Sequence, residues 1–236
     1  MTGAEEKPDH RQSTMNLLRM KGAWGGLHGA LYESVVARAC APLYRRFVAE
    51  AVPDIPDGAR VLDLGCGGGH VTSILAERFP RCGVTGVDLS PAQVRRARKR
   101  YDLPNLVFCE GDALCIPCED QSVDLLTSVA SIKHWPDRRA GLLEVFRVLV
   151  PGGTLCIVEA NRQASHETCR AFVTHWRHVL PGTGWLLARY FRTVVAGQAL
   201  ALKELTGLLH GVGFTAIEAR ELHEHPFVMA RATRPS

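Results

Sequence analysis

One short segment, in which an apolar run leads straight into glycines, constrains the fold of this chain more than any other. Residues 61–69 read Val-Leu-Asp-Leu-Gly-Cys-Gly-Gly-Gly. Such a run is typical of a buried strand in a parallel sheet, and glycines at its carboxyl end let the backbone turn sharply and approach a ligand closely. A second apolar run, 84–88, ends in Asp88, which is placed to accept hydrogen bonds from ribose hydroxyls. The two strand ends predict a nucleotide-type binding site.

The spacing of the glycines indicates which ligand this site binds. A dinucleotide fingerprint reads Gly-x-Gly-x-x-Gly, and its third glycine allows close helix packing for a pyrophosphate at the helix N-terminus. Counted from Gly65, that third position is His70, and Asp63 lies two residues before the first glycine. An acid there would repel a pyrophosphate but suits a ligand with an ammonium group and no phosphate, such as S-adenosylmethionine. A nicotinamide oxidoreductase is an alternative that His70 opposes.

Four further segments extend this pattern in a fixed order. They are 87–90 (Val-Asp-Leu-Ser), 110–113 (Glu-Gly-Asp-Ala), 122–126 (Ser-Val-Asp-Leu-Leu) and 147–153 (Arg-Val-Leu-Val-Pro-Gly-Gly). With the glycine loop, they resemble the class I S-adenosylmethionine-dependent methyltransferases, in the broad group that includes ubiquinone and menaquinone biosynthesis methyltransferases. The resemblance is close over residues 58–160. One glycine loop alone would be weak evidence, whereas five segments in sequence are strong.

The alternation of short β-branched runs with helical patterns from Arg60 onward predicts βαβ units. The expected fold is α/β, with a Rossmann-like open sheet that is mostly parallel and carries helices on both faces. The resemblance implies an antiparallel strand at the C-terminal edge. We expect strands near residues 60–64, 83–87, 106–109, 123–129 and 154–159, and closing strands at 214–220 and 227–231.

A chain of 236 residues with 46% apolar content can bury one substantial core, so we expect a single methyltransferase domain, residues 1–236. Its first 12 residues are polar and read as disordered, and the helical pattern that follows predicts a lid. The expected parts are 1–50 for this start and lid, 58–160 for the cofactor-binding core, 161–213 for a helical substrate cover and 214–236 for the closing strands.

The resemblance implies that the cofactor lies at the carboxyl ends of the strands, where open parallel sheets bind ligands. Gly65, Cys66 and Gly67 should run beneath the methionine and ribose parts, with Asp63 serving the amino group directly or through water. Asp88 should accept two ribose hydroxyl bonds, since Ser90 is available to cap the following helix. The remaining expected contacts are Gly111, Asp112 and Ala113 at the adenine, Ser128 and Val129 at the methionine end, and the neighbouring Leu89 and Gln93.

Methyl transfer is an in-line displacement, so the protein mainly has to align the reactants and exclude water. If the acceptor is a hydroxyl, a base must take its proton, and His134 at the exit of the fourth strand is the catalytic candidate. The alternative is that His134 shapes the loop. Lys133 would suit an anionic substrate there, but the expectation is an exposed lysine.

The methyl acceptor is expected to be a small molecule, apolar or aromatic, as in the biosynthesis of a quinone, lipid or secondary metabolite. Aromatic residues in the lid and in the segment 172–191 supply candidate walls for it. The same residues would also serve to pack the added helices onto the sheet. The substrate-binding candidates are Trp24, Tyr32, Trp176 and Trp185, with Tyr44 and Tyr190 nearby in sequence.

Charge and hydropathy disfavour several other classes of protein. A net charge of +4 is too mild to imply a nucleic-acid partner, and the basic run 95–100 reads as the solvated face of a helix. The apolar stretches are far short of the roughly 20 residues that span a bilayer. Residues 1–20 also lack the core of a signal peptide. We therefore expect a cytoplasmic protein without a transmembrane segment, and the sequence leaves its oligomeric state open.

Thiol and metal chemistry are weaker interpretations. The eight cysteines read as reduced apolar groups, and Cys115 and Cys118 have redox spacing without a second such pair. The histidine pairs 175/178 and 223/225 lack accompanying ligands, so we expect no metal. A non-catalytic S-adenosylmethionine-binding or scaffold domain is the alternative from a different class.

Overall fold

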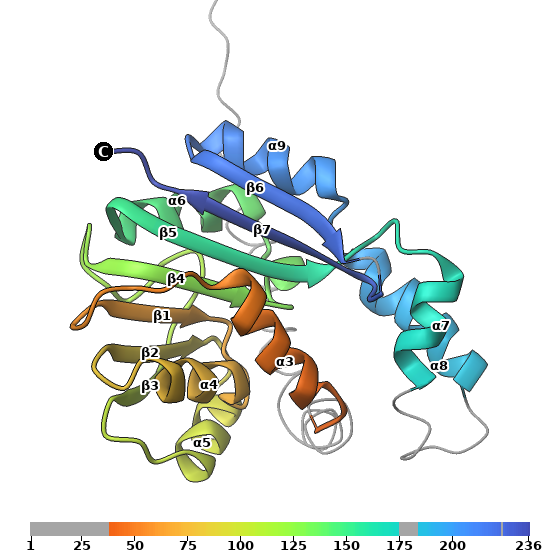
Figure 1. The fold of residues 1–236 in the computed structure, drawn as a ribbon, viewed down its shortest axis with the longest axis horizontal. Helices are drawn as coiled ribbons and strands as arrows, with labels where there is room; N and C mark the ends of the chain where they lie inside the picture. The colour runs from red at the N-terminus through yellow and green to blue at the C-terminus, as the bar shows by residue number, and fades with distance from the viewer. Residues whose placement is uncertain (1–37, 175–183, 223) are drawn as a thin grey trace, which may run out of the picture.

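The computed structural model describes residues 38–174, 184–222 and 224–236. Within these residues a seven-stranded sheet has the order β3-β2-β1-β4-β5-β7-β6 (Figure 1). Strands β1 to β5 are all parallel to one another, and β7 is antiparallel to both β5 and β6. This arrangement confirms the Rossmann-like sheet with an antiparallel C-terminal strand. The strands are β1 (Arg60–Leu64), β2 (Gly83–Asp88), β3 (Leu106–Glu110), β4 (Val123–Val129), β5 (Leu149–Ala160), β6 (Thr215–Leu222) and β7 (Phe227–Thr233).

Helices cover both faces of the sheet, as expected. On one face α3 (Arg38–Ala51) and α4 (His70–Arg78) pack against the strands, and α6 (Arg138–Val148) and α9 (Leu202–Val212) pack on the other. Figure 1 shows α3 and α4 in front of the sheet and α6 behind it. The remaining helices are α5 (Pro91–Arg100) beside β3, and α7 (His166–Thr174) and α8 (Gly184–Tyr190) near the carboxyl end of β5.

The central strands are apolar on both sides because both sides are covered. In β1, Val61 belongs to the core under α3 and α4, whereas Leu62 and Leu64 belong to the core under α6 and α9. Neighbouring residues of β4, Leu125 and Leu126, divide in the same way. A strand buried on both faces needs a nearly continuous apolar run, which is why the segment 61–64 can be predicted as a strand from the sequence.

The strand β5 begins at Leu149, earlier than the expected start at residue 154. Its first residues continue the pairing with β4 across a β-bulge between Val123 and Leu125. Gly152, with φ of 78°, donates its N–H to Arg234 O at 2.9 Å, and the glycine pair 152–153 lies inside the strand. A glycine with positive φ at such a bulge bends the strand without ending it.

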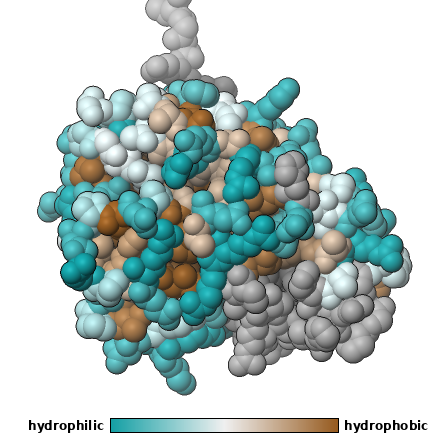
Figure 2. Space-filling view, in the orientation of Figure 1, coloured by the Kyte–Doolittle hydropathy of each residue, from teal (hydrophilic) through white to brown (hydrophobic). Residues whose placement is uncertain are grey.

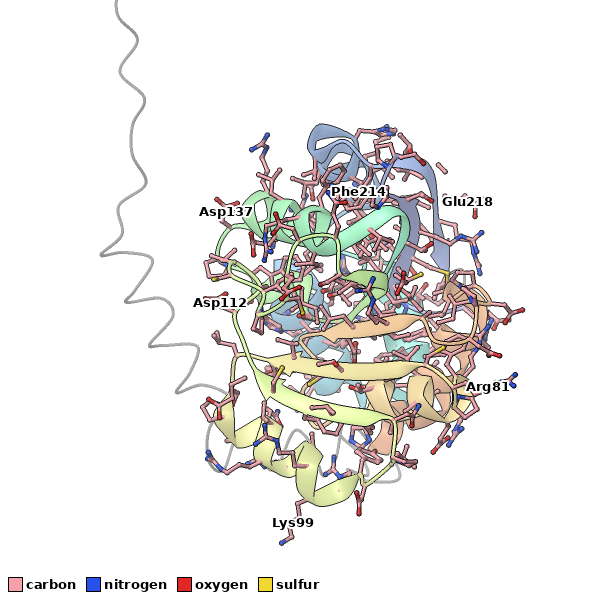
Figure 3. All side chains as sticks on the ribbon, turned by 90° about the vertical axis from the view of Figure 1, so that its left-hand side faces the viewer. Arg81, Lys99, Asp112, Asp137, Phe214 and Glu218 are labelled. Carbon is pink, nitrogen blue, oxygen red and sulfur yellow. The ribbon has the colours of Figure 1, made fainter. Side chains whose placement is uncertain are left out.

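The surface is mixed, as a chain with 22% charged residues should be. Figure 2 shows hydrophilic and hydrophobic side chains interspersed on one face of the molecule. At the end of α5, Lys99 points away from the protein (Figure 3), whereas Arg98 bonds to the backbone oxygen of Phe108. In the described part of the chain, helices of the length and apolarity that a bilayer crossing requires are not found.

Candidate functional site

One cavity lies at the carboxyl ends of the parallel strands. Its walls come from the loops after β1, β2, β3 and β4, together with Tyr44 of α3 and His70 at the start of α4. Ligands of open parallel sheets bind at this edge. We refer to the part formed by residues 63–68, 88–93 and 111–113 as the cofactor side, and to the part formed by residues 129–136 as the β4 exit.

The loop after β1 brings these two parts into contact. Gly65 has φ of 78°, and a Cβ atom at this position would lie 1.9 Å from Ser131 Oγ. The N–H groups of Gly65 and Cys66 both donate to Val87 O, at 2.7 and 3.0 Å. Only glycine tolerates such a conformation together with such a close approach. The loop is therefore fixed between the end of β2 and the β4 exit.

Asp88 holds the glycine loop and the start of α5 with its two carboxylate oxygens. Gly67 N–H donates to Oδ2 and Ser90 N–H donates to Oδ1, both at 2.8 Å. The expected side-chain cap from Ser90 is not formed, and Ser90 Oγ is buried without a hydrogen-bond partner among the described residues. The expectation that the Ser90 side chain caps α5 was therefore wrong, and Ser90 is held instead through its own N–H by Asp88. A carboxylate oxygen can accept more than one hydrogen bond.

Asp63 is buried at the end of β1, where it accepts hydrogen bonds from two threonines. Thr72 Oγ1 donates to Oδ2 at 2.6 Å and Thr127 Oγ1 donates to Oδ1 at 3.0 Å. Burial raises the pKa of Asp63 to about 6, against the lowering effect of these bonds. A carboxylate kept in such an environment is poised to interact with a cationic group.

The loop after β3 forms another wall of the cofactor side. Asp112 Oδ1 accepts the N–H of Leu114 at 2.9 Å, so this carboxylate also shapes its own turn. Arg147, from α6, supports the loop from behind by donating to Ile116 O and Cys118 O at 3.0 and 2.9 Å. The Arg-Val-Leu-Val-Pro-Gly-Gly segment thus contributes to the site through this arginine, a role that the sequence reasoning did not assign.

The β4 exit contains a buried ion pair that the sequence did not reveal. Lys133, expected to be exposed, has a side chain only 6% exposed, and its Nζ lies 2.9 Å from Glu159 Oε1 on β5. Glu159 is completely buried. The expectation for Lys133 was wrong because its partner comes from a strand 26 residues away. No local pattern signals such a partner.

His134 lines the cavity at the β4 exit. Burial, together with the charges of Lys133 and Arg138, lowers the pKa of His134 to about 3. The imidazole is therefore neutral at physiological pH and a weak base in this environment. His134 therefore lies in the cavity as predicted, and its role there stays a prediction.

His70 also lines the cavity, on the side of α4. Arg100 Nη1 lies 2.9 Å from its Nε2, and Tyr101 Oη lies 2.7 Å from its Nδ1. Both ring nitrogens of His70 therefore have a polar neighbour from the end of α5 or the residue after it. Tyr44 stacks on His70 with ring centroids 6.2 Å apart. The sequence reasoning used His70 only to exclude a dinucleotide and gave it no place in the site.

Most of the predicted cofactor residues line this one cavity, and their contacts with a ligand stay predictions. The exception is Ser128, which is fully buried outside the lining, with no hydrogen-bond partner for its Oγ among the described residues. Trp185 is 63% exposed and does not line the cavity, and Trp24, Tyr32 and Trp176 lie outside the described residues. The predicted residues in the lining are Asp63, Gly65, Cys66, Gly67, Asp88, Leu89, Gln93, Gly111, Asp112, Ala113 and His134.

A methyltransferase domain family model matches residues 55–204, which include every strand end of the cavity. The chain therefore belongs to the class I S-adenosylmethionine-dependent methyltransferases, as its motifs indicated. It is 36% identical over 146 residues to the demethylmenaquinone methyltransferase of Deinococcus radiodurans, covering 61% of this chain and 60% of that protein. It is 32% identical over 204 residues to the trans-aconitate 2-methyltransferase of Paracidovorax citrulli, covering 80% and 74%.

Solved structures share the fold at low sequence identity. A methyltransferase from Aquifex aeolicus has a TM-score of 0.60 at 17% identity, covering 81% of this chain and 87% of that chain. Phosphoethanolamine N-methyltransferase 2 from Haemonchus contortus, solved with S-adenosyl-L-methionine, has a TM-score of 0.60 at 18% identity, covering 83% and 53%. These likenesses confirm the fold class predicted from the sequence.

Proposed function

We propose that this chain transfers a methyl group from S-adenosylmethionine to a small-molecule acceptor bound at the β4 exit. The observation that carries this proposal is the convergence of the glycine loop, Asp63 and Asp88 on one cavity in a member of the methyltransferase family. Residues 58–160 act as the cofactor-binding core, and the helical segments on either side of it cover the substrate.

The cavity fits the cofactor in its chemistry. Two backbone N–H groups orient the Asp88 carboxylate, and its oxygens, each of which can accept more than one hydrogen bond, would accept the ribose hydroxyls. Asp112 and Ala113 would meet the adenine, and the buried carboxylate of Asp63 would face the cationic methionine end directly or through water. These carboxylates give the cofactor side a negative character that matches a ligand carrying an ammonium and a sulfonium.

The bound cofactor supplies an electrophilic methyl group on a positively charged sulfur. The residues of this chain then have to hold the acceptor in line with that methyl group and keep water out. Ser131 and Trp135 contribute to the wall between cofactor and acceptor, since Trp135 Nε1 donates to Ser131 Oγ at 3.1 Å and Ser131 lies against Gly65. His134 would orient the acceptor by hydrogen bonding as a neutral imidazole.

The acceptor is a small metabolite of the kind that the relatives methylate. Those relatives are named for demethylmenaquinone and for trans-aconitate, so the panel of acceptors to test includes quinols and carboxylates. His134 and Trp135 supply aromatic and polar surface at the β4 exit. A biosynthetic role in the cytoplasm is consistent with this chemistry.

The test is an incubation of the purified protein with methyl-labelled S-adenosylmethionine and a panel of quinols, carboxylates, phenols, amines and thiols. We expect label in one class of acceptor, and less label when Asp88→Ala replaces the native chain at the same low cofactor concentration. Calorimetry on the native chain measures cofactor binding separately. Tight binding without transfer to any acceptor would contradict the proposal and favour a non-catalytic binding domain.

A further inference from the structure

The backbone at the β4 exit contains a residue in an unfavourable conformation. Ala130 has φ of 55°, in the left-handed region that non-glycine residues rarely adopt. Its N–H donates to Val158 O at 2.7 Å, and its carbonyl accepts from Lys133 Nζ. Such conformations persist where the surroundings determine them strongly, and they gather at functional sites. Ala130 lines the cavity, so its conformation sets the position of a wall.

The buried ion pair determines this turn through several bonds at once. Lys133 Nζ joins the Ala130 carbonyl to Glu159 Oε1. Glu159 Oε2 accepts the backbone N–H of Lys133 at 3.2 Å, at the short 3₁₀ helix Ile132–His134. Ala160 N–H donates to Glu159 Oε1 at 2.7 Å. One carboxylate on β5 therefore holds both the turn at Ala130 and the helix that presents His134.

A buried ion pair is an inefficient way to stabilise a fold. Removing two charges from water is unfavourable, and apolar residues of similar volume in the same place often give an equal or greater stability. What the ion pair provides, and apolar residues do not, is a set of directional bonds to chosen backbone atoms. Here two of those atoms, the carbonyl oxygen of Ala130 and the backbone nitrogen of Lys133, belong to the β4 exit.

We propose that Lys133 and Glu159 are positioning residues for methyl transfer, which fix the Ala130 turn and so hold the β4 exit at the correct distance from the glycine loop. This inference rests on the proposed function. Loss of the pair should lower kcat roughly 10- to 100-fold, because misplacement of reacting groups by about 1 Å is enough for such an effect. The affinity for S-adenosylmethionine should change less than about threefold, because Asp88 and Gly67 do not depend on the pair.

The decisive variant replaces both partners, Lys133→Met with Glu159→Met, so that no unpaired charge is left buried. We measure the melting temperature, the affinity for S-adenosylmethionine by calorimetry, kcat on the acceptor found in the panel, and amide hydrogen exchange at residues 129–134. The expected result is a retained fold and affinity, a reduced kcat and faster exchange at the Ala130 N–H. A kcat within about twofold of the native value, with unchanged exchange, would overturn the proposal.

Two further variants keep the result interpretable. Lys133→Arg retains the charge, so the fold should survive even if the double variant does not, but the longer planar group displaces the bond to the Ala130 carbonyl. It too should lower kcat, and a native kcat with native exchange at Ala130 would count against the proposal. The control removes the exposed ion pair of Arg81 and Asp57, and should change none of these quantities.

The exchange measurement also separates this inference from the proposed function. If the native chain methylates nothing in the panel, the proposed function fails on that result alone. Faster exchange at Ala130 in the double variant would still support the fixing of the turn by the pair. Unchanged exchange would overturn the inference in either case.

Discussion

The glycine loop after β1 and the β4 exit are neighbouring walls of one cavity, but they obtain their shape by opposite means. The glycine loop turns at residues that adopt positive φ without strain, at Gly65 and Gly67. The β4 exit turns at Ala130, which needs a buried ion pair to hold it. The comparison teaches that the glycine loop turns because of the residue types in its own sequence, whereas the turn at the β4 exit depends on a side chain from another strand.

The largest loss of stability is expected for a substitution at the contact between these two walls. Gly65→Ala should reduce the free energy of unfolding by about 3 kcal/mol or more, because its Cβ would overlap Ser131 Oγ and its φ is positive. Cofactor binding should be lost with it. Gly67→Ala is the matched variant, since its φ is 52° but nothing lies within 4 Å of its added Cβ, and it should lose only about 1–2 kcal/mol. Chemical denaturation of both variants measures the difference, and equal losses would show that the two walls do not meet as described.

Asp63 provides a test by pH on the cofactor side. Its pKa in the folded protein, about 6, lies above the ordinary 3.8, so the folded state holds this proton more tightly than the unfolded chain does. The stability associated with that proton is fully present below pH 3.8 and is lost as the pH rises through 6, by at most about 3 kcal/mol. Asp63→Asn should abolish this loss, so the free energy of unfolding of the cofactor-free variant should fall less between pH 4 and 7.

Ionisation of Asp63, which lowers the stability of the cofactor-free fold, should raise its affinity for the cofactor. An ionised Asp63 favours a cationic ligand, so the affinity of the native chain should weaken as the pH falls below about 6. Calorimetry between pH 5 and 8 tests this, with Asp63→Asn expected to bind weakly at every pH. A native affinity independent of pH would separate Asp63 from the cofactor.

Asp88→Ala should weaken cofactor binding by about 1.5–3 kcal/mol through the loss of charged hydrogen bonds. The substitution also frees the N–H groups of Gly67 and Ser90, so part of the effect comes from a loosened glycine loop. Asp124→Ala, which removes an exposed partner of Arg60, is the control and should leave the affinity unchanged. An unaltered dissociation constant for Asp88→Ala would remove this carboxylate from the ribose site.

The sequence predicted the cofactor side better than the β4 exit for a physical reason. The glycines, Asp63 and Asp88 lie within or directly after apolar strands, where the pattern itself places them at the ligand edge of the sheet. Lys133 and Glu159 are paired across two strands, and only tertiary packing turns a lysine expected at the surface into a buried one. Of the two residues expected at the methionine end of the cofactor, Val129 lines the cavity and Ser128 does not.

The smallest effect is expected at His134. Burial first, and then Lys133 and Arg138, hold its pKa near 3, so the ring stays neutral from about pH 5 upward. His134→Ala should lower turnover about tenfold or less, and the pH–rate profile of the native chain should lack an inflection near 6.5 from this residue. A loss of 100-fold or more with an intact fold, together with such an inflection, would show that His134 is a general base. The β4 exit would then contribute a catalytic residue.

The position of β7 between β5 and β6 has a consequence for how the nascent chain folds. The buried residues 156–160 of β5 find their outer partner only in residues 227–231 of β7, which are translated much later (Figure 1). Until then β5 presents an open, apolar strand edge, the kind of surface that chaperones shield and that drives aggregation. The open edge of β5 is therefore covered only after β7 has left the ribosome.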